Sequence, residues 1–156
     1  MTDTSSGAIS VRKGTPADAA AAAEVWLRSR EAARPAIPAP VHSDDDVRHH
    51  FRTTIAEERE LWVAVEATGE VVGLLVLDGA GVDQLYVDPR WWSQGIGSQL
   101  LALAKQQRPD GLWLWTFQAN TGARRFYERH GFVAVEETDG SGNEEQAPDV
   151  RYAWEP

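Results

Sequence analysis

The order of hydrophobic and polar residues divides the chain into short strands and longer helices. Apolar runs at 61–66, 71–77, 82–88 and 112–117 predict strands, and the second of these is apolar throughout, as in a strand covered on both faces. Further strands are predicted at 9–13, where apolar and polar residues alternate, and at 132–137 and 150–154. Apolar residues at helical spacing predict helices at about 16–33, 43–55, 97–107 and 121–130.

Prolines, glycines and polar residues mark the connections between these elements. Residues 34–40 contain three prolines, which remove N–H donors and exclude a helix there. Residues 67–70 predict a hairpin turn, and the polar residues 139–148 predict a flexible loop. Without a repeat or a second hydrophobic unit, the chain is expected to form one domain over 1–156, with 1–7 as a flexible N-terminus.

Composition narrows the class of protein. A chain of 156 residues can bury a full core, and 42% hydrophobic residues with seven tryptophans argue against disorder. The absence of cysteine excludes disulfides, thiolate metal sites and a cysteine nucleophile. The first residues lack the basic and apolar segments of a signal peptide, and no apolar run approaches a membrane span. A soluble cytoplasmic protein without a membrane partner is expected.

The net charge of −9 by itself disfavours a nucleic-acid partner. The distribution of charge along the chain gives further information about the ligands. Residues 90–130 carry six basic and two acidic side chains, a balance of +4, so the remainder carries −13. A positive segment inside an acidic protein suits a polyanionic cofactor and a cationic second substrate. Surface charge that serves only solubility explains the same distribution.

One stretch, residues 86–101, has the pattern of a phosphate-binding loop. A strand is followed by a polar loop with Gly95 and Gly97, and then by a helix. Glycine allows close approach of the backbone, and the first N–H groups of a helix are free to bind an anion. No lysine follows Gly97, which excludes a P-loop NTPase, and Leu100 replaces the third glycine of a dinucleotide fingerprint.

Two motifs together resemble the GNAT superfamily of acyl-CoA-dependent N-acyltransferases. Residues 92–97 (Trp-Ser-Gln-Gly-Ile-Gly) match its pyrophosphate loop except that Trp92 replaces an Arg or Gln. About 25 residues later, 120–132 carry the Asn, Ala, Phe-Tyr and Gly-Phe of the family at matching spacings. The element order βααβββαβαβ also matches. The resemblance implies an α/β fold of the α+β type, with a mixed, mostly antiparallel sheet of six to seven strands flanked by four helices.

The resemblance implies acetyl-CoA as the cofactor and assigns residues to it. The family's loop binds the pyrophosphate with backbone amides, and the strand before it separates from its neighbour to free main-chain groups. The residues expected to bind the cofactor are Leu85, Tyr86, Val87, Gln94, Gly95, Ile96, Gly97, Ser98, Gln99, Asn120, Ala123, Arg124, Phe126, Tyr127 and Arg129. Asn120 as a simple helix cap, and Arg124 and Arg129 as solvated side chains, are the alternatives.

Two residues are expected to handle protons. By resemblance Tyr127 is the acid for the departing thiolate, and the alternative is that it only packs beside Phe126. Asp83 on the strand before the loop is the candidate base, although a lone aspartate there is more often solvated. Weaker candidates are Glu66, His42, His49 and His50. The two adjacent histidines lack the spacing of a metal site, so no metal is expected.

The acceptor pocket of this fold usually lies between the first two helices and the last strands. The residues expected to line it are Trp26, Arg30, Ile37, Gln84 and Trp115, although core packing is an alternative for Trp115. The expected reaction is direct attack of a small, cationic primary amine on acetyl-CoA in a ternary complex. A protein or peptide amine is one alternative acceptor, and a non-catalytic acyl-CoA-binding module is an alternative function. The resemblance also implies that a homodimer is common.

Overall fold

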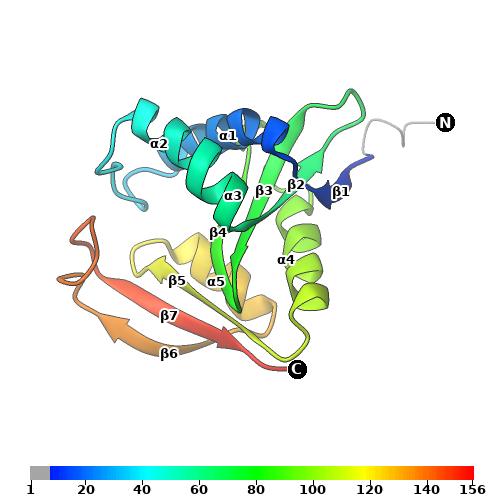
Figure 1. The fold of residues 1–156 in the computed structure, drawn as a ribbon. Coiled ribbons are helices and arrows are strands. Elements are labelled where there is room, and N and C mark those ends of the chain that lie inside the picture. The colour runs from blue at the N-terminus through cyan, green and yellow to red at the C-terminus, as the bar shows by residue number, and fades with distance from the viewer. Residues whose placement is uncertain (1–7) are drawn as a thin grey trace.

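A computed structural model describes residues 8–156, which form a single seven-stranded sheet with helices on both faces (Figure 1). The strands lie in the order β1-β2-β3-β4-β5-β7-β6. This confirms the mixed, mostly antiparallel sheet, since only β4 and β5 pair in parallel. The strands are β1 (Ser10–Lys13), β2 (Glu60–Val65), β3 (Val71–Asp78), β4 (Gly81–Val87), β5 (Leu112–Phe117), β6 (Val133–Thr138) and β7 (Asp149–Trp154).

Among residues 8–156, four helical segments accompany the sheet, as the sequence predicts, besides the single 3-10 turn η4 (Pro89–Trp91). The second of them is continuous: α2 passes through a stretch of π-helix, η3, into the short α3. Ser43 caps this segment by accepting a hydrogen bond from the Asp46 N–H, and acidic residues occupy its first turn, where the helix dipole favours them. The bounds are η2 (Pro16–Asp18) leading into α1 (Ala19–Ala32), α2 (Asp44–His50), η3 (Phe51–Ile55), α3 (Ala56–Glu58), α4 (Ile96–Gln107) and α5 (Thr121–Arg129).

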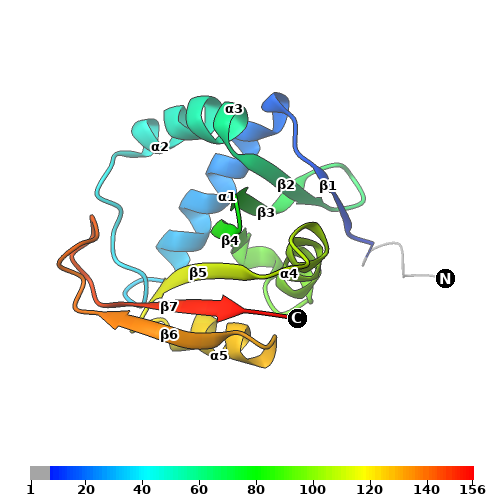
Figure 2. The same ribbon diagram turned by 60° about the horizontal axis from the view of Figure 1, so that its bottom comes forward.

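Strand β3 lies at the centre of the core and is buried on both faces. Leu74 and Val76 point to the cluster that contains α1, whereas Leu75 and Leu77 point to the cluster that contains α4. This alternation follows from the two-residue period of a strand. The views in Figures 1 and 2 show α1 to α3 on one side of β2 to β4, with α4 on the other side and α5 beside β5 to β7.

The sheet opens between β4 and β5. The two strands pair only at Gly81 and Trp113, and they separate beyond that point. A Cβ on Gly81 would lie 2.8 Å from an indole atom of Trp113, so the close approach at this pair requires glycine. The separation expected from the resemblance is therefore confirmed. It leaves the second halves of both strands facing a gap, and the candidate site lies there.

The connections also follow the sequence. Residues 67–70 form the β2–β3 hairpin turn, and the proline-rich residues 34–40 form turns without a helix. Residues 139–148 form a loop with internal hydrogen bonds, including one of 2.8 Å from the Asn143 side chain to the Ala147 carbonyl. The flexibility of that loop stays a prediction. Within residues 8–156, no helix combines the length and apolar character needed to cross a membrane.

Candidate active site

The loop between β4 and α4 leaves a row of main-chain donors free. Ser93 and Gly95 both have positive φ, 65° and 81°, and Gly95 is the N-cap of α4. The first helical hydrogen bond runs from the Gln99 N–H to the Gly95 carbonyl at 3.1 Å. Within the described chain, the N–H groups of residues 94–98 donate to no protein group outside α4. Such a helix N-terminus is suited to bind phosphate.

A groove of about 460 Å³ begins at this loop and runs along β4 and α5. Phe126 forms part of its wall and packs against Gly97, where a Cβ would lie 3.3 Å from the Phe126 ring. Gly97 thus lets α5 approach the start of α4. The residues that line the groove are Ser29, Ala33, Ile37, Leu85, Tyr86, Val87, Trp92, Ser93, Gly97, Asn120, Gly122, Ala123, Phe126 and Tyr127.

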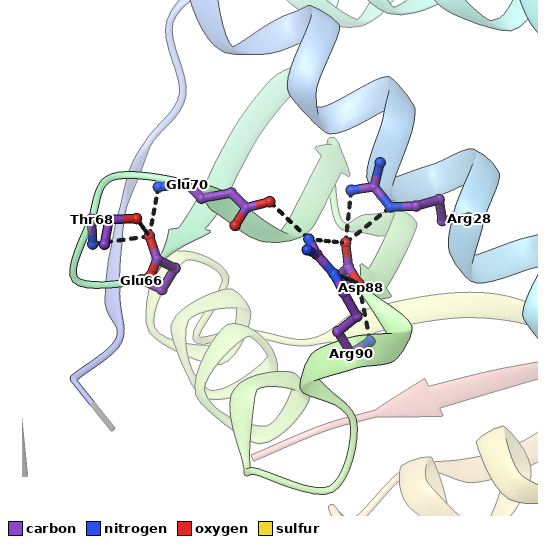
Figure 3. Close-up of polar contacts among 6 residues, drawn as sticks. All are labelled: Arg28, Glu66, Thr68, Glu70, Asp88 and Arg90. Carbon is purple, nitrogen blue, oxygen red and sulfur yellow. Dashed lines mark hydrogen bonds and ion pairs between the residues drawn. The ribbon is translucent and has the colours of Figure 1, made fainter. Parts of the chain in front are cut away.

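The start of the loop is held by Asp88, whose contacts with Arg28 and Arg90 are drawn in Figure 3. Its side chain is completely buried. Its carboxylate accepts hydrogen bonds of 2.7 and 3.0 Å from Arg28 of α1, and of 3.0 and 3.1 Å from the Arg90 side chain. The Arg90 N–H also donates to it, and Arg90 reaches Glu70 of the β2–β3 hairpin at 2.7 Å. Burial opposes ionisation of Asp88, but these hydrogen bonds outweigh it and lower the pKa to about 2.

The carbonyl of Val87, at the end of β4, accepts two hydrogen bonds. The Ser29 hydroxyl donates to it at 2.8 Å, and the Trp92 indole N–H donates at 2.7 Å. Trp92 remains 45% exposed and lines the groove. The residue that replaces Arg or Gln at the start of the motif therefore connects the loop to the strand. None of these contacts was predicted from the sequence, because their partners lie in different elements.

Tyr127 lies where this groove meets a second, narrow cavity. Its side chain is buried, and none of the hydrogen bonds found among residues 8–156 involves its hydroxyl. Desolvation, with a smaller contribution from Tyr86, raises the pKa of the Tyr127 phenol, so it stays protonated at neutral pH. The phenol therefore holds a proton and has no fixed acceptor for it.

The narrow cavity, of about 90 Å³, fills the gap between β4 and β5. Asp83 lies at its exposed rim, where desolvation by the surrounding protein raises the pKa of its carboxyl above the ordinary value. We refer to this cavity as the passage. The residues that line it are Ile37, Val82, Asp83, Gln84, Leu85, Tyr86, Leu114, Trp115, Thr116, Phe117, Asn120, Ala123 and Tyr127.

Two wider cavities adjoin the passage on the side away from the loop. One, of about 590 Å³, contains Trp26, Arg30 and Gln84, and the indole N–H of Trp26 donates to the Gln84 side chain at 2.8 Å. The other, of about 670 Å³, lies beside Trp115 and the 139–148 loop. The structure thus brings the five residues expected to bind the acceptor to neighbouring cavities that share lining residues, since Ile37, Gln84 and Trp115 also line the passage.

Some predicted cofactor residues have other contacts. Arg124 donates to the Tyr152 hydroxyl at 3.0 Å and, like Gln99 and Arg129, does not line the groove. Asn120 caps α5 by accepting from the Ala123 N–H at 3.2 Å, and it lines both groove and passage.

His130 lies within 2.8 Å of the Phe126 carbonyl and within 3.1 Å of the Ser98 hydroxyl. It therefore joins the end of α5 to the first turn of α4. Within the described residues, no group of three or more His, Cys, Asp and Glu side chains has the arrangement of a metal site.

The geometry of the loop, groove and passage agrees with a comparison to known protein families. The model of the acetyltransferase (GNAT) family matches residues 22–132, which is most of the chain. The chain belongs to the GNAT family. The family match makes it an N-acetyltransferase that uses acetyl-CoA, and the free N–H groups of residues 94–98 beside an open groove fit that cofactor.

Several relatives of this GNAT protein carry names that state an acceptor. The peptidyl-lysine N-acetyltransferase YjaB of Salmonella typhimurium is 30% identical over 131 residues, which cover 80% of this chain and 83% of that protein. The peptidyl-lysine N-acetyltransferase YiaC of Escherichia coli is 26% identical over 81% of this chain and 84% of its own length.

Solved structures share the fold. The solution structure of apo-form YjaB from Escherichia coli superposes with a TM-score of 0.76 at 24% identity, over 94% of this chain and 97% of that one. The PaiA N-acetyltransferase from Thermoplasma acidophilum, solved in complex with coenzyme A, superposes with a TM-score of 0.70 at 19% identity, over 96% and 99% of the two chains.

Removing the charge of Asp88 tests how the loop is held. We expect Asp88→Asn to lower the free energy of unfolding by about 1–3 kcal/mol at pH 7 and to weaken CoA binding. Because the folded-state pKa lies below the ordinary 3.8, this stabilisation is present above pH 4 and is lost as the pH falls towards 2. The difference between wild type and variant should shrink over that range in urea unfolding.

Asp110→Asn is the matched control, since Asp110 is exposed and lies in a turn. Equal stability of the two variants, or a difference from wild type that does not depend on pH, would contradict this role of Asp88. CoA affinity measured by calorimetry gives the second comparison between the variants.

Proposed function

We propose that this acetyltransferase acetylates the ε-amine of a lysine residue in a peptide or protein. One observation supports this choice above others: the gap between β4 and β5 holds a passage of only about 90 Å³, which shares lining residues with cavities of about 590 and 670 Å³. An unbranched chain ending in an amine fits a passage of this size, and the bulk of a peptide fits the wider cavities outside. The names of YjaB and YiaC support the same acceptor.

The residues of the passage suit the proton transfers of this reaction. Acetyl-CoA supplies the acetyl group as a thioester, and the attacking amine must first lose a proton. A lysine amine with a pKa of about 10.4 is neutral in roughly one molecule in 2,500 at pH 7. A base that removes the proton therefore offsets the small fraction of amine that is able to attack. Asp83 at the rim accepts that proton in the proposed mechanism, and burial raises the pKa of its carboxyl and so makes it a better base.

Tyr127 acts at the other end of the reaction. Its buried phenol donates a proton to the departing sulfur as the thioester bond breaks, and its unused hydroxyl at the junction of groove and passage supports this role. The phenol is a weaker acid than a thiol, so the transfer is uphill, but a hydrogen bond to developing negative charge lowers the barrier in a site shielded from water.

A small cationic amine is the second candidate acceptor, as expected from the sequence. The cavity of about 590 Å³ carries the carboxylates of Asp46, Glu144 and Glu145, which attract a cation. A polyamine satisfies this requirement without any peptide. The two candidates differ in what surrounds the amine, and turnover measurements can separate them.

The test of the acceptor is thiol release from acetyl-CoA with two amines, a blocked lysine peptide and spermidine. We expect a kcat/KM at least tenfold higher for the peptide, with mass spectrometry placing the acetyl group on the ε-amine. Transfer to spermidine alone would favour the second candidate. Absence of thiol release with both amines would contradict the proposed acceptors.

The role of Tyr127 predicts a loss of rate without a loss of cofactor. Tyr127→Phe keeps the ring and its packing but removes the proton donor, so kcat should fall roughly tenfold to hundredfold. The Kd for CoA, measured by calorimetry, should stay within twofold of wild type. An unchanged kcat would show that Tyr127 serves only to pack the groove.

The role of Asp83 predicts a change in the pH–rate profile. Below its raised pKa the Asp83 carboxyl is protonated and cannot accept a proton, so kcat/KM should fall on the acid side. Asp83→Asn should lower kcat/KM at pH 7 and abolish that inflection, while Asp110→Asn keeps it. A profile that is the same for wild type and Asp83→Asn would eliminate Asp83 as the base.

A further inference from the structure

Arg30 of α1 is a buried cation with few hydrogen bonds to the described protein groups. The residue is 7% exposed, and a guanidinium carries five N–H donors. Among residues 8–156, its Nη2 makes a long hydrogen bond of 3.5 Å to Glu145. The guanidinium also lies beside the Tyr86 phenol, where it opposes the rise in the phenol's pKa that burial causes. The Arg30 Nε is shielded from solvent and has no partner among these residues. Buried donors in native proteins are nearly always paired, so an unpaired one requires an explanation.

The surroundings of Arg30 fix its orientation without satisfying its donors. Its guanidinium lies 4.6 Å from the ring centroid of Trp26 and 6.0 Å from that of Phe117. These contacts hold the plane of the group by cation–π attraction and leave its N–H edges for other partners. Trp26 is itself held by its hydrogen bond to Gln84. The arginine is therefore pre-oriented rather than loosely placed.

The position of Arg30 relates these donors to the acceptor. Arg30 and Gln84 line the cavity of about 590 Å³, and Gln84 also lines the passage. Glu145 lines both wide cavities. An acceptor whose amine enters the passage and whose remaining atoms occupy the cavity of about 590 Å³ lies beside this arginine. The group that a guanidinium binds best is an oxygen of a carbonyl or carboxylate.

We propose that Arg30 is a specificity-determining residue that binds a carbonyl-type oxygen of the acceptor, on the part of the molecule that stays outside the passage. This inference rests on the proposed function and makes it more specific. In a peptide the oxygen belongs to the main-chain carbonyl beside the acetylated lysine, and in a free amino acid it belongs to the carboxylate. An amine without such an oxygen leaves the donors of Arg30 unused.

The test compares acceptors that share the amine and methylene chain and differ in the oxygen. Nα-acetyl-lysine amide carries carbonyl oxygens, Nα-acetyl-lysine carries a carboxylate, and n-pentylamine carries neither. Thiol release from acetyl-CoA is measured for each with wild type, with Arg30→Lys and with Arg30→Gln. Arg34→Lys is the matched control, because Arg34 lies just beyond α1 in an exposed pair with Glu31.

Wild type should prefer the two oxygen-bearing acceptors to n-pentylamine by roughly tenfold or more in kcat/KM, the size expected for a hydrogen bond to a charged group. Arg30→Lys should remove most of this preference by raising the acceptor KM, while the rate with n-pentylamine and the Kd for CoA stay within about twofold. Arg34→Lys should behave as wild type. The oxygen-bearing acceptor with the higher kcat/KM shows whether Arg30 binds a carbonyl or a carboxylate in the natural acceptor.

Three results would overturn the assignment. A wild type without preference for the oxygen does so even if neither variant folds. A parallel fall for all three acceptors in Arg30→Lys and Arg30→Gln shows that Arg30 only maintains the fold, and an unchanged preference in both shows that it does not bind the acceptor. If no amine releases thiol, the proposed function fails first, and this assignment fails with it.

Discussion

The separation of β4 from β5 is the constraint on which the rest of the site depends. A strand inside a sheet normally uses its main-chain groups on both sides, and buried groups without partners are costly. Beyond the pair Gly81–Trp113, β4 loses its neighbour on one side. The groove and the passage lie along that unpaired half, and the free N–H groups of residues 94–98 follow it in the chain. The contact of Gly81 with the Trp113 ring marks the one point at which the two strands still pair.

A second constraint is that the loop with free donors must not rearrange to satisfy them. Ser93 has a positive φ, which is unfavourable for a residue with a side chain, so the neighbouring structure must hold it. Asp88 supplies that support by binding Arg28 of α1 and Arg90, which reaches Glu70 of the β2–β3 hairpin. Trp92 joins the loop to the end of β4, and Ser29 joins α1 to the same carbonyl. Ion pairs on the surface contribute little, but this carboxylate is fully buried.

The sequence predicted features that depend on residues close together in the chain, and it missed contacts between residues far apart in the chain. Strands, helices and the glycine loop depend on neighbouring residues, and their predicted bounds agree with the structure to within a few residues. The partners of Arg28 and Trp26 are 60 and 58 positions away, and no local pattern indicates them. Arg124 is another example. Its charge suggested that it binds a phosphate of the cofactor, but the register of β7 places the Tyr152 hydroxyl beside it, and no local pattern indicates that partner.

The charges around the proposed acceptor site add to what net charge alone implies. An acidic chain suggested an acceptor that is simply cationic, and the carboxylates of Asp46, Glu144 and Glu145 agree with that. Arg30 does not, because a buried guanidinium beside the same cavity repels a second positive group and attracts an oxygen. A polyamine offers only amines to this surface. An aminoacyl group offers an amine at one end and a carbonyl at the other, and it satisfies both signs of charge with a single orientation.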